Sequence, residues 1–158
     1  MLVVLILPGD IQAVGLRLEI VDQTRQRVLF VREVEAADRL LLEHTHSVTK
    51  RPVEEVFSVG RGGIAMEELR FDEFGANLPA GPQTIGGVTT TFRHEDAGYY
   101  RVLHHGRPLG TVPLRVGGPK VDHVLTLPGG DRVRLLDLAP RGTNVELGIR
   151  GVPRATSE

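Results

Sequence analysis

The sequence predicts an all-β fold, either a single-domain antiparallel sandwich or a partly closed barrel of about ten short strands. Apolar and polar residues alternate in several stretches, which is the period of a half-buried strand. Turn-forming residues separate these stretches, with 19 Gly and 10 Pro among 158 residues. No stretch shows a convincing amphipathic helical pattern. A chain of this length is the size of one ordinary domain, which we place at residues 15–150.

The first half of the chain shows the clearest strand patterns. Residues 16–20 alternate between apolar and charged side chains, as in a strand with one buried face. Pro52 has no amide hydrogen to donate and must interrupt the strand that begins at Leu40. A Gly-rich turn at residues 60–63 predicts a hairpin between the strands on either side. Further strands are expected at residues 28–34, 40–48, 53–59 and 64–71.

Glycine and proline dominate the middle of the chain. They are so frequent in residues 75–87 that no apolar period survives, and a loop of this length more often belongs to a binding site than to a plain connection. Residues 106–108 predict a turn, and residues 128–131 give the clearest hairpin signal. Residues 151–158 are expected to form a tail. Strands are expected at residues 88–92, 99–103, 109–116, 121–127, 132–138 and 145–149.

The N-terminal segment, residues 1–14, carries the one signal for a cellular compartment. An apolar run from Leu2 to Leu7 ends at Pro8 and is followed by small residues. The run is shorter than the roughly 7 to 15 apolar residues of a signal peptide and the roughly 20 of a spanning helix. Two interpretations stay open: a first buried strand or frayed end, or the remnant of a signal or membrane anchor.

Composition excludes several classes of function. The chain has no cysteine, which removes thiol catalysis, disulfides and cysteine-ligated zinc. The formal net charge is −1, with 19 basic and 20 acidic residues, so no large field attracts nucleic acid. Five Phe, two Tyr and no Trp leave few platforms for stacking bases or sugars. We therefore expect no nucleic-acid partner.

Two compact motifs lie close together in the sequence. The first reads HSV-x-K-x-PV-x-E from His46 to Glu55, and the second reads FGA-x-LP from Phe74 to Pro79. This pairing resembles the small bacterial family known as domain of unknown function family 1850. The resemblance extends over about residues 16–149.

The resemblance implies a cellular context and no reaction. Members of the family are typically extracytoplasmic, with an N-terminal membrane segment. They are encoded with or fused to the permease of tripartite ATP-independent periplasmic (TRAP) transporters that use TAXI-type solute-binding proteins. Together with the absence of a complete catalytic constellation, the resemblance implies a non-enzymatic, extracytoplasmic accessory or ligand-contacting component. The implied partners are TRAP membrane subunits or a solute-binding protein, and no cofactor is expected. The alternative is a stand-alone small-molecule or metal-binding β module.

The candidate ligand-binding residues come from the two motifs. Lys50 and Arg51 could hold a carboxylate, and the resemblance implies a small carboxylate ligand because the usual TRAP substrates carry one. The family usually has Gly where Asn77 stands, and Asn tolerates a left-handed backbone better than most residues. The full set of candidates is His46, Ser47, Lys50, Arg51, Glu55, Phe74, Gly75 and Asn77.

Two other interpretations compete for the first motif. His46 and Ser47 could instead satisfy backbone groups where the strand breaks before Pro52. A catalytic pair is disfavoured because adjacent strand residues point to opposite faces, and no G-x-S-x-G elbow is present. No catalytic residue is therefore expected.

A metal site remains open from the sequence. The spacing of His44 and His46 puts two imidazoles on one face of a regular strand, although this pattern alone is a weak signal. A third ligand could come from Glu54, Glu55, His94, His104, His105 or His123.

An acidic cluster precedes the second motif. Its members are expected to be solvated, with one alternative in which Glu68 receives Lys50 or Arg70, because a buried carboxylate without a partner is costly. The cluster consists of Glu67, Glu68, Asp72 and Glu73.

Overall fold

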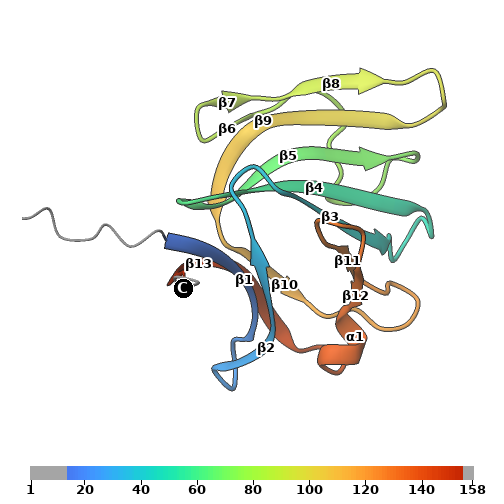
Figure 1. Cartoon of the computed structure of the whole chain (residues 1–158). Coiled ribbons are helices and arrows are strands. Elements are labelled where there is room, and N and C mark those ends of the chain that lie inside the picture. The colour runs from blue at the N-terminus through green and yellow to red at the C-terminus, as the bar shows by residue number, and fades with distance from the viewer. Residues whose placement is uncertain (1–13, 155–158) are drawn as a thin grey trace, which may run out of the picture.

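The computed structural model describes residues 14–154, which form two antiparallel sheets packed as a sandwich, together with a small two-stranded hairpin (Figure 1). The all-β class predicted from the sequence is confirmed. Neither sheet closes into a barrel, so the sandwich is the correct form of that prediction. Residues 1–13 lie outside the described residues, as does most of the predicted N-terminal segment.

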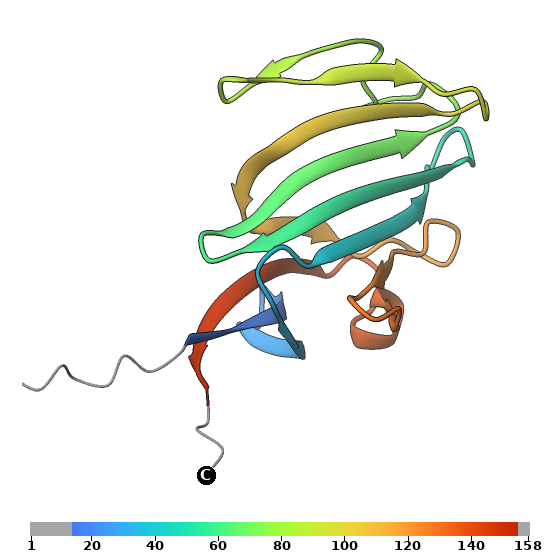
Figure 2. The same cartoon turned by 45° about the horizontal axis from the view of Figure 1, so that its top comes forward.

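The larger sheet has seven strands in the order β12-β11-β3-β4-β5-β9-β8. The strands β3, β4 and β5 follow one another in the sequence and in the sheet. Figure 2 shows β8 at the edge of this sheet, beyond the area that the smaller sheet covers. The strands are β3 (Arg39–Thr45), β4 (Pro52–Gly60), β5 (Gly63–Phe71), β8 (Thr91–His94), β9 (Tyr100–Gly110), β11 (Val124–Thr126) and β12 (Arg132–Arg134).

The smaller sheet has four strands in the order β10-β13-β1-β2. Its first and last strands in the sequence pair with each other, so Val14 lies opposite Pro153. The strands are β1 (Val14–Asp22), β2 (Arg27–Val34), β10 (Val112–Arg115) and β13 (Asn144–Pro153). The remaining elements are the hairpin strands β6 (Thr84–Ile85) and β7 (Val88–Thr89) and the helical turn α1 (Leu135–Leu138).

The core lies between the facing sides of the two sheets. Leu18, Ile20 and Leu147 of the smaller sheet are fully buried, as are Phe57 and Leu125 of the larger one. These are alternate residues of strands whose other face is polar, which is the pattern that the sequence shows for residues 16–20. Each such side chain contributes roughly 1.5–3 kcal/mol by burial, so the sandwich needs no disulfide.

The predicted hairpins are confirmed. The Gly-rich turn joins β4 to β5, with Gly60 opposite Gly63. The turn at residues 128–131 joins β11 to β12, where the amide of Leu127 donates to the carbonyl of Asp131 at 2.8 Å. The prediction of a strand over residues 64–71, in place of a helix, is also correct.

Two predicted elements are wrong. Residues 106–108 are no turn, because β9 runs straight through them as an irregular strand, with His105 and Gly106 at positive φ. The extra residues form a β-bulge, and its Gly-Arg-Pro sequence resembles that of a turn. The strand predicted at residues 132–138 instead turns into α1, because Leu135 and Ala139 bury the same side of a helical turn.

The loop and the tail are shorter than predicted. Residues 75–87 contain β6, which pairs with β7 across a turn in which Gly86 and Gly87 have positive φ. Strand β13 continues to Pro153 through its pairing with β1, so the first residues of the predicted tail belong to the sheet.

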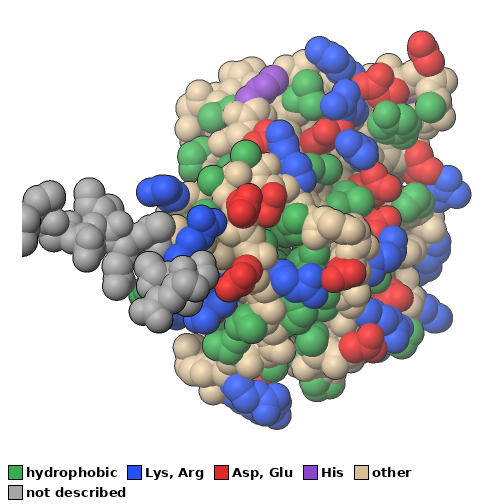
Figure 3. Space-filling model, viewed as in Figure 1, with side chains coloured by type: hydrophobic (Ala, Val, Ile, Leu, Met, Phe, Trp, Pro, Cys, Tyr) green, Lys and Arg blue, Asp and Glu red, His purple; other side chains and the backbone are tan. Residues whose placement is uncertain are grey.

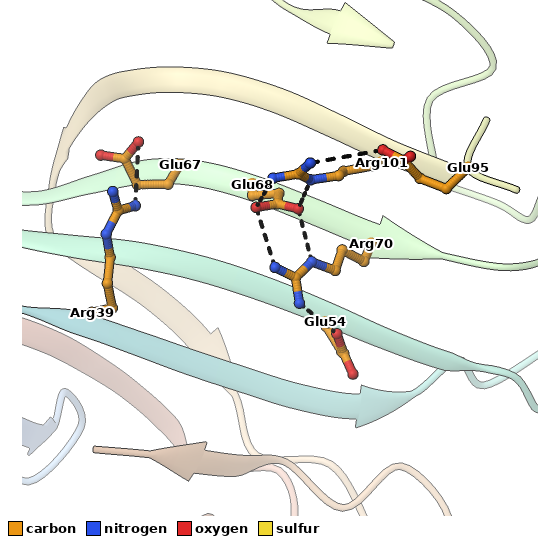
Figure 4. A network of polar contacts seen from close by, with 7 residues as sticks. All are labelled: Arg39, Glu54, Glu67, Glu68, Arg70, Glu95 and Arg101. Atoms are coloured by element: carbon orange, nitrogen blue, oxygen red, sulfur yellow. Dashed lines mark hydrogen bonds and ion pairs between the residues drawn. The ribbon is translucent and has the colours of Figure 1, made fainter. Parts of the chain in front are cut away.

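The outer face of the larger sheet carries a ladder of ion pairs (Figure 4). Glu68 accepts hydrogen bonds from Arg70, at 2.8 Å, and from Arg101. Arg70 also reaches Glu54 at 3.5 Å, and Arg101 reaches Glu95 at 3.7 Å. The expectation that the acidic cluster is solvated is wrong for Glu68, which is buried under its two partners. The alternative, in which Glu68 receives Arg70, is confirmed.

Charges of both signs are interspersed over the face drawn in Figure 3. This view shows no extended basic patch of the kind that binds nucleic acid. No helix within residues 14–154 is long and apolar enough to cross a membrane.

Candidate functional site

The first motif forms the hairpin turn between β3 and β4. Strand β3 ends at Thr45, which lies opposite Pro52 at the start of β4. The turn is closed by hydrogen bonds from the amide of His46 to the carbonyl of Arg51, at 2.8 Å, and from the amide of Lys50 to the carbonyl of His46, at 3.0 Å. Pro52 therefore interrupts the strand, as predicted, by beginning the return strand.

The imidazole of His46 joins the two motifs. Its Nδ1 accepts from the amides of Val48 and Thr49, both at 3.2 Å, and its Nε2 donates to the carbonyl of Ala76 at 3.0 Å. These partners fix the tautomer with the proton on Nε2. A Cβ on Gly75 would lie 3.0 Å from Cε1 of this ring, so the glycine of the second motif gives the ring its space. The two motifs converge in space.

Ser47, Lys50 and Arg51 are not arranged around a ligand. Lys50 has φ of 59°, and its Nζ donates to the carbonyl of Ser47 within the same turn. Arg51 donates from Nε to both carboxylate oxygens of Asp72, at 3.1 and 3.0 Å, and this pairing lowers the pKa of Asp72. The Ser47 hydroxyl makes no hydrogen bond with any residue that the structure describes.

The second motif lies next to the ring of His46. Phe74 packs on the aromatic rings of Tyr100 and Phe71, with ring centroids 4.3 and 5.9 Å apart, and stacks parallel to Phe92. Asn77 has φ of 67°, so it adopts the left-handed backbone expected at a position where the family usually has Gly.

A cleft of about 500 Å³ opens beside the joined motifs. This volume lies within the range of small-molecule sites. One wall is the inner face of β3, β4 and β5 together with both motifs, and it includes His46, Ser47, Glu55 and Asn77. Lys50, Arg51, Phe74 and Gly75 do not line the cleft, contrary to the expectation that Lys50 and Arg51 share a polar mouth with His46 and Glu55.

The opposite wall comes from segments that lie after β10 and α1. Val116 holds them together, since its amide donates to the carbonyl of Thr143 at 2.9 Å and its carbonyl accepts from Gly142 at 2.8 Å. A Cβ on Gly117 would lie 2.6 Å from Cγ1 of Val121, so this wall requires glycine there. The residues that this wall contributes are Arg115, Val116, Gly117, Gly118, Val121, His123, Arg141 and Gly142.

Arg115 and Arg141 are the cations of the cleft. Both side chains are exposed, and neither forms an ion pair with a carboxylate within residues 14–154. The sequence analysis missed both, because nothing marks an arginine at a strand end or in a Pro-Arg-Gly turn. The only available signal was the glycine that follows each arginine, Gly117 after Arg115 and Gly142 after Arg141.

His44 on β3 and His123 of the opposite wall lie close together, with ring centroids 5.1 Å apart. Burial, together with the nearby His123 and His46, lowers the pKa of His44 to about 4. Burial also lowers the pKa of His123, whose Nδ1 accepts from the amide of Gly117 at 3.2 Å. Both rings are therefore neutral near pH 7 and add no positive charge to the cleft.

Glu55 lies on the inner face of the larger sheet, between the buried Leu42 and Leu69 of the adjacent strands. Burial raises the pKa of its carboxyl group. The carboxyl group makes no hydrogen bond or ion pair in the part of the chain that the structure describes. It faces the cleft without a partner of its own.

This geometry does not support a metal site or a catalytic His46–Ser47 pair. Among the described residues no group of three or more His, Asp or Glu side chains is placed to hold a metal ion. Strand β3 ends before His46, so His44 and His46 do not share a strand face as expected. The His46 nitrogens are bonded to backbone groups and not to the Ser47 hydroxyl.

A second hollow, of about 340 Å³, lies at the Pro52 end of the sheet. Its charged residues are already paired, Arg70 with Glu54 and Asp72 with Arg51. The 500 Å³ cleft is therefore the better candidate for a charged ligand.

The model of one protein family matches residues 40–134, which is more than half of the chain, and its description is Domain of unknown function (DUF1850). The chain belongs to this family. The resemblance drawn from the two motifs is thereby confirmed, and both motifs lie inside the matched range. No curated protein and no solved structure matches the chain.

Proposed function

We propose that this DUF1850 domain is a non-enzymatic binding domain whose cleft takes the carboxylate of a small organic acid. The observation that carries the proposal is a pair of guanidinium groups, those of Arg115 and Arg141, that have no carboxylate partner among the described residues. They lie on a cleft whose other wall includes residues of both motifs. Arginine suits planar carboxylates because its donors form a fork that matches the two oxygens.

Neutral histidines support this assignment. His44 and His123 leave the two arginines as the source of positive charge in the cleft, so an anion is directed to that wall. The absence of a His46–Ser47 hydrogen bond within the described residues supports binding over hydrolysis.

For the cellular role, we propose an accessory or ligand-contacting component of a TRAP-type transporter outside the cytoplasm. This part of the proposal rests on the family and on what the resemblance implies for its context. The alternative is a small-molecule-binding module that acts alone, and the same cleft would serve it.

Thermal unfolding in the presence of a panel of small carboxylic acids tests the binding proposal. An acid at about a hundred times its dissociation constant should stabilise the domain by roughly 2.7 kcal/mol, a rise of several degrees in the midpoint. We expect Arg141→Gln to remove this rise and Arg93→Gln, a change of an exposed arginine on β8, to keep it. A panel that produces no rise in the wild-type protein would contradict the proposal.

Capture experiments test the transporter proposal separately. A membrane-anchored, tagged form should recover TRAP membrane subunits or a solute-binding protein from cells that express them. Binding of an acid by the purified domain without any such recovery would favour the stand-alone module.

A further inference from the structure

The charges of the cleft point to a narrower class of ligand than carboxylic acids in general. Arg115 and Arg141 lack an anionic partner on one wall, while Glu55 lacks a cationic partner on the other, within the range that the structure describes. A plain carboxylate would pair with the arginines and leave the half-buried Glu55 without a cation. A ligand that carries both charges would satisfy both walls, because the two exposed arginines and the half-buried Glu55 would then each gain an opposite charge.

The groups around Glu55 do not supply the missing cation. His44 and His123 are kept neutral by burial, and His46 has committed its Nε2 proton to the carbonyl of Ala76. Leu42 and Leu69 occupy the cross-strand positions on either side of Glu55. No cation within residues 14–154 is paired with Glu55, so we infer that the ligand supplies it.

The uncharged part of the cleft is aliphatic. Among the described residues, the imidazoles are the only aromatic rings that line it, so it favours a branched aliphatic group over a planar one. The aliphatic residues come from β4 and β5, from the second motif and from the segment between β10 and β11, and they are Val53, Leu69, Leu78, Val116 and Val121.

We propose that the cleft binds a neutral aliphatic α-amino acid as its zwitterion. The carboxylate binds at Arg115 and Arg141, the ammonium group binds at Glu55, and the side chain packs on Val53 and Leu69. This inference rests on the proposed function, since it assigns the same carboxylate to the same arginines and adds the ammonium and aliphatic groups.

Isothermal titration at pH 7 with three matched probes tests the inference. The probes are L-leucine, 4-methylpentanoate, which lacks the ammonium group, and leucinamide, which lacks the carboxylate. We expect L-leucine to bind at least about tenfold more tightly than either, because each probe forfeits one charged contact. The comparison on the wild-type protein needs no variant.

Variants then assign the two charges. In Glu55→Gln, L-leucine and 4-methylpentanoate should bind within about twofold of each other, whereas Arg141→Gln should weaken both. Glu33→Gln, at an exposed position of β2 that does not line the cleft, should retain the wild-type preference.

The outcomes separate this inference from the proposed function. If 4-methylpentanoate binds as tightly as L-leucine, the ammonium site is wrong and the carboxylate site stands. If L-serine or L-aspartate binds more tightly than L-leucine, the aliphatic assignment is wrong. If no acid of any kind binds, the inference and the proposed function fail together.

Discussion

The substitution His46→Ala removes the contact that joins the two motifs. It deletes two hydrogen bonds accepted by Nδ1 within the turn and one donated by Nε2 to Ala76. At a net value of about 1 kcal/mol for each bond, the free energy of unfolding should fall by about 2–3 kcal/mol. For a domain of this length the midpoint of thermal unfolding should fall by roughly 5–10 °C.

Urea unfolding measures this change, and two neighbouring variants show where it comes from. His46→Asn keeps a side-chain acceptor for the turn amides but cannot reach Ala76, so it should lose only about 1 kcal/mol. Ser47→Ala removes an exposed hydroxyl and should change stability by less than about 0.5 kcal/mol. If His46→Ala unfolds within about 0.5 kcal/mol of the wild type, this histidine does not hold the motifs together.

Three further predictions follow from the same contacts. Gly75→Ala should cost about 1–2 kcal/mol in urea unfolding, because its methyl group meets the His46 ring, and it should cost less in a His46→Ala background. Glu68→Gln should lower the free energy of unfolding by about 1–3 kcal/mol at pH 7. Burial alone would raise the pKa of Glu68, but its two arginine partners lower it, so the difference between variant and wild type should shrink as the pH falls below about 4.5. The pKa of His44 is about 4 in the folded state, below its usual 6.5, so the unfolded state binds this proton more readily. The free energy of unfolding is therefore unaffected by this proton above pH 6.5 and decreases as the pH falls toward 4. We expect this loss to be about 1–2 kcal/mol, after allowing for the partial solvent exposure of the ring, and His44→Gln should lack it when unfolding is compared at pH 7 and pH 4.

The fold was largely predictable from local pattern. The alternation over residues 16–20 and the glycine turns at 60–63 and 128–131 are short-range signals, and the structure confirms each of them. The bulge in β9 and the helical turn α1 were not predictable in this way. Both depend on how the strand packs against its neighbours, and local turn chemistry gives no information about that.

Only one wall of the cleft was predictable. Both motifs were identified from residue types and spacing, and His46, Glu55 and Asn77 do reach the cleft. Arg115 and Arg141 come to the opposite wall through the pairing of β10 with β13, a contact between distant parts of the sequence. The residues around each arginine form no sequence pattern that predicts its place in the cleft.

Nuclear magnetic resonance of the histidine rings gives the most direct test of the central claim, that the cleft binds a carboxylate. The chain has six histidines, so the imidazole signals can be followed one by one during a titration with 4-methylpentanoate at pH 7. The account predicts saturable shifts of the His44 and His123 signals, which lie in the cleft, and unchanged signals for His94 and His105 on β8 and β9. Shifts at His94 or His105 alone, or none at His44 and His123 up to millimolar acid, would contradict it.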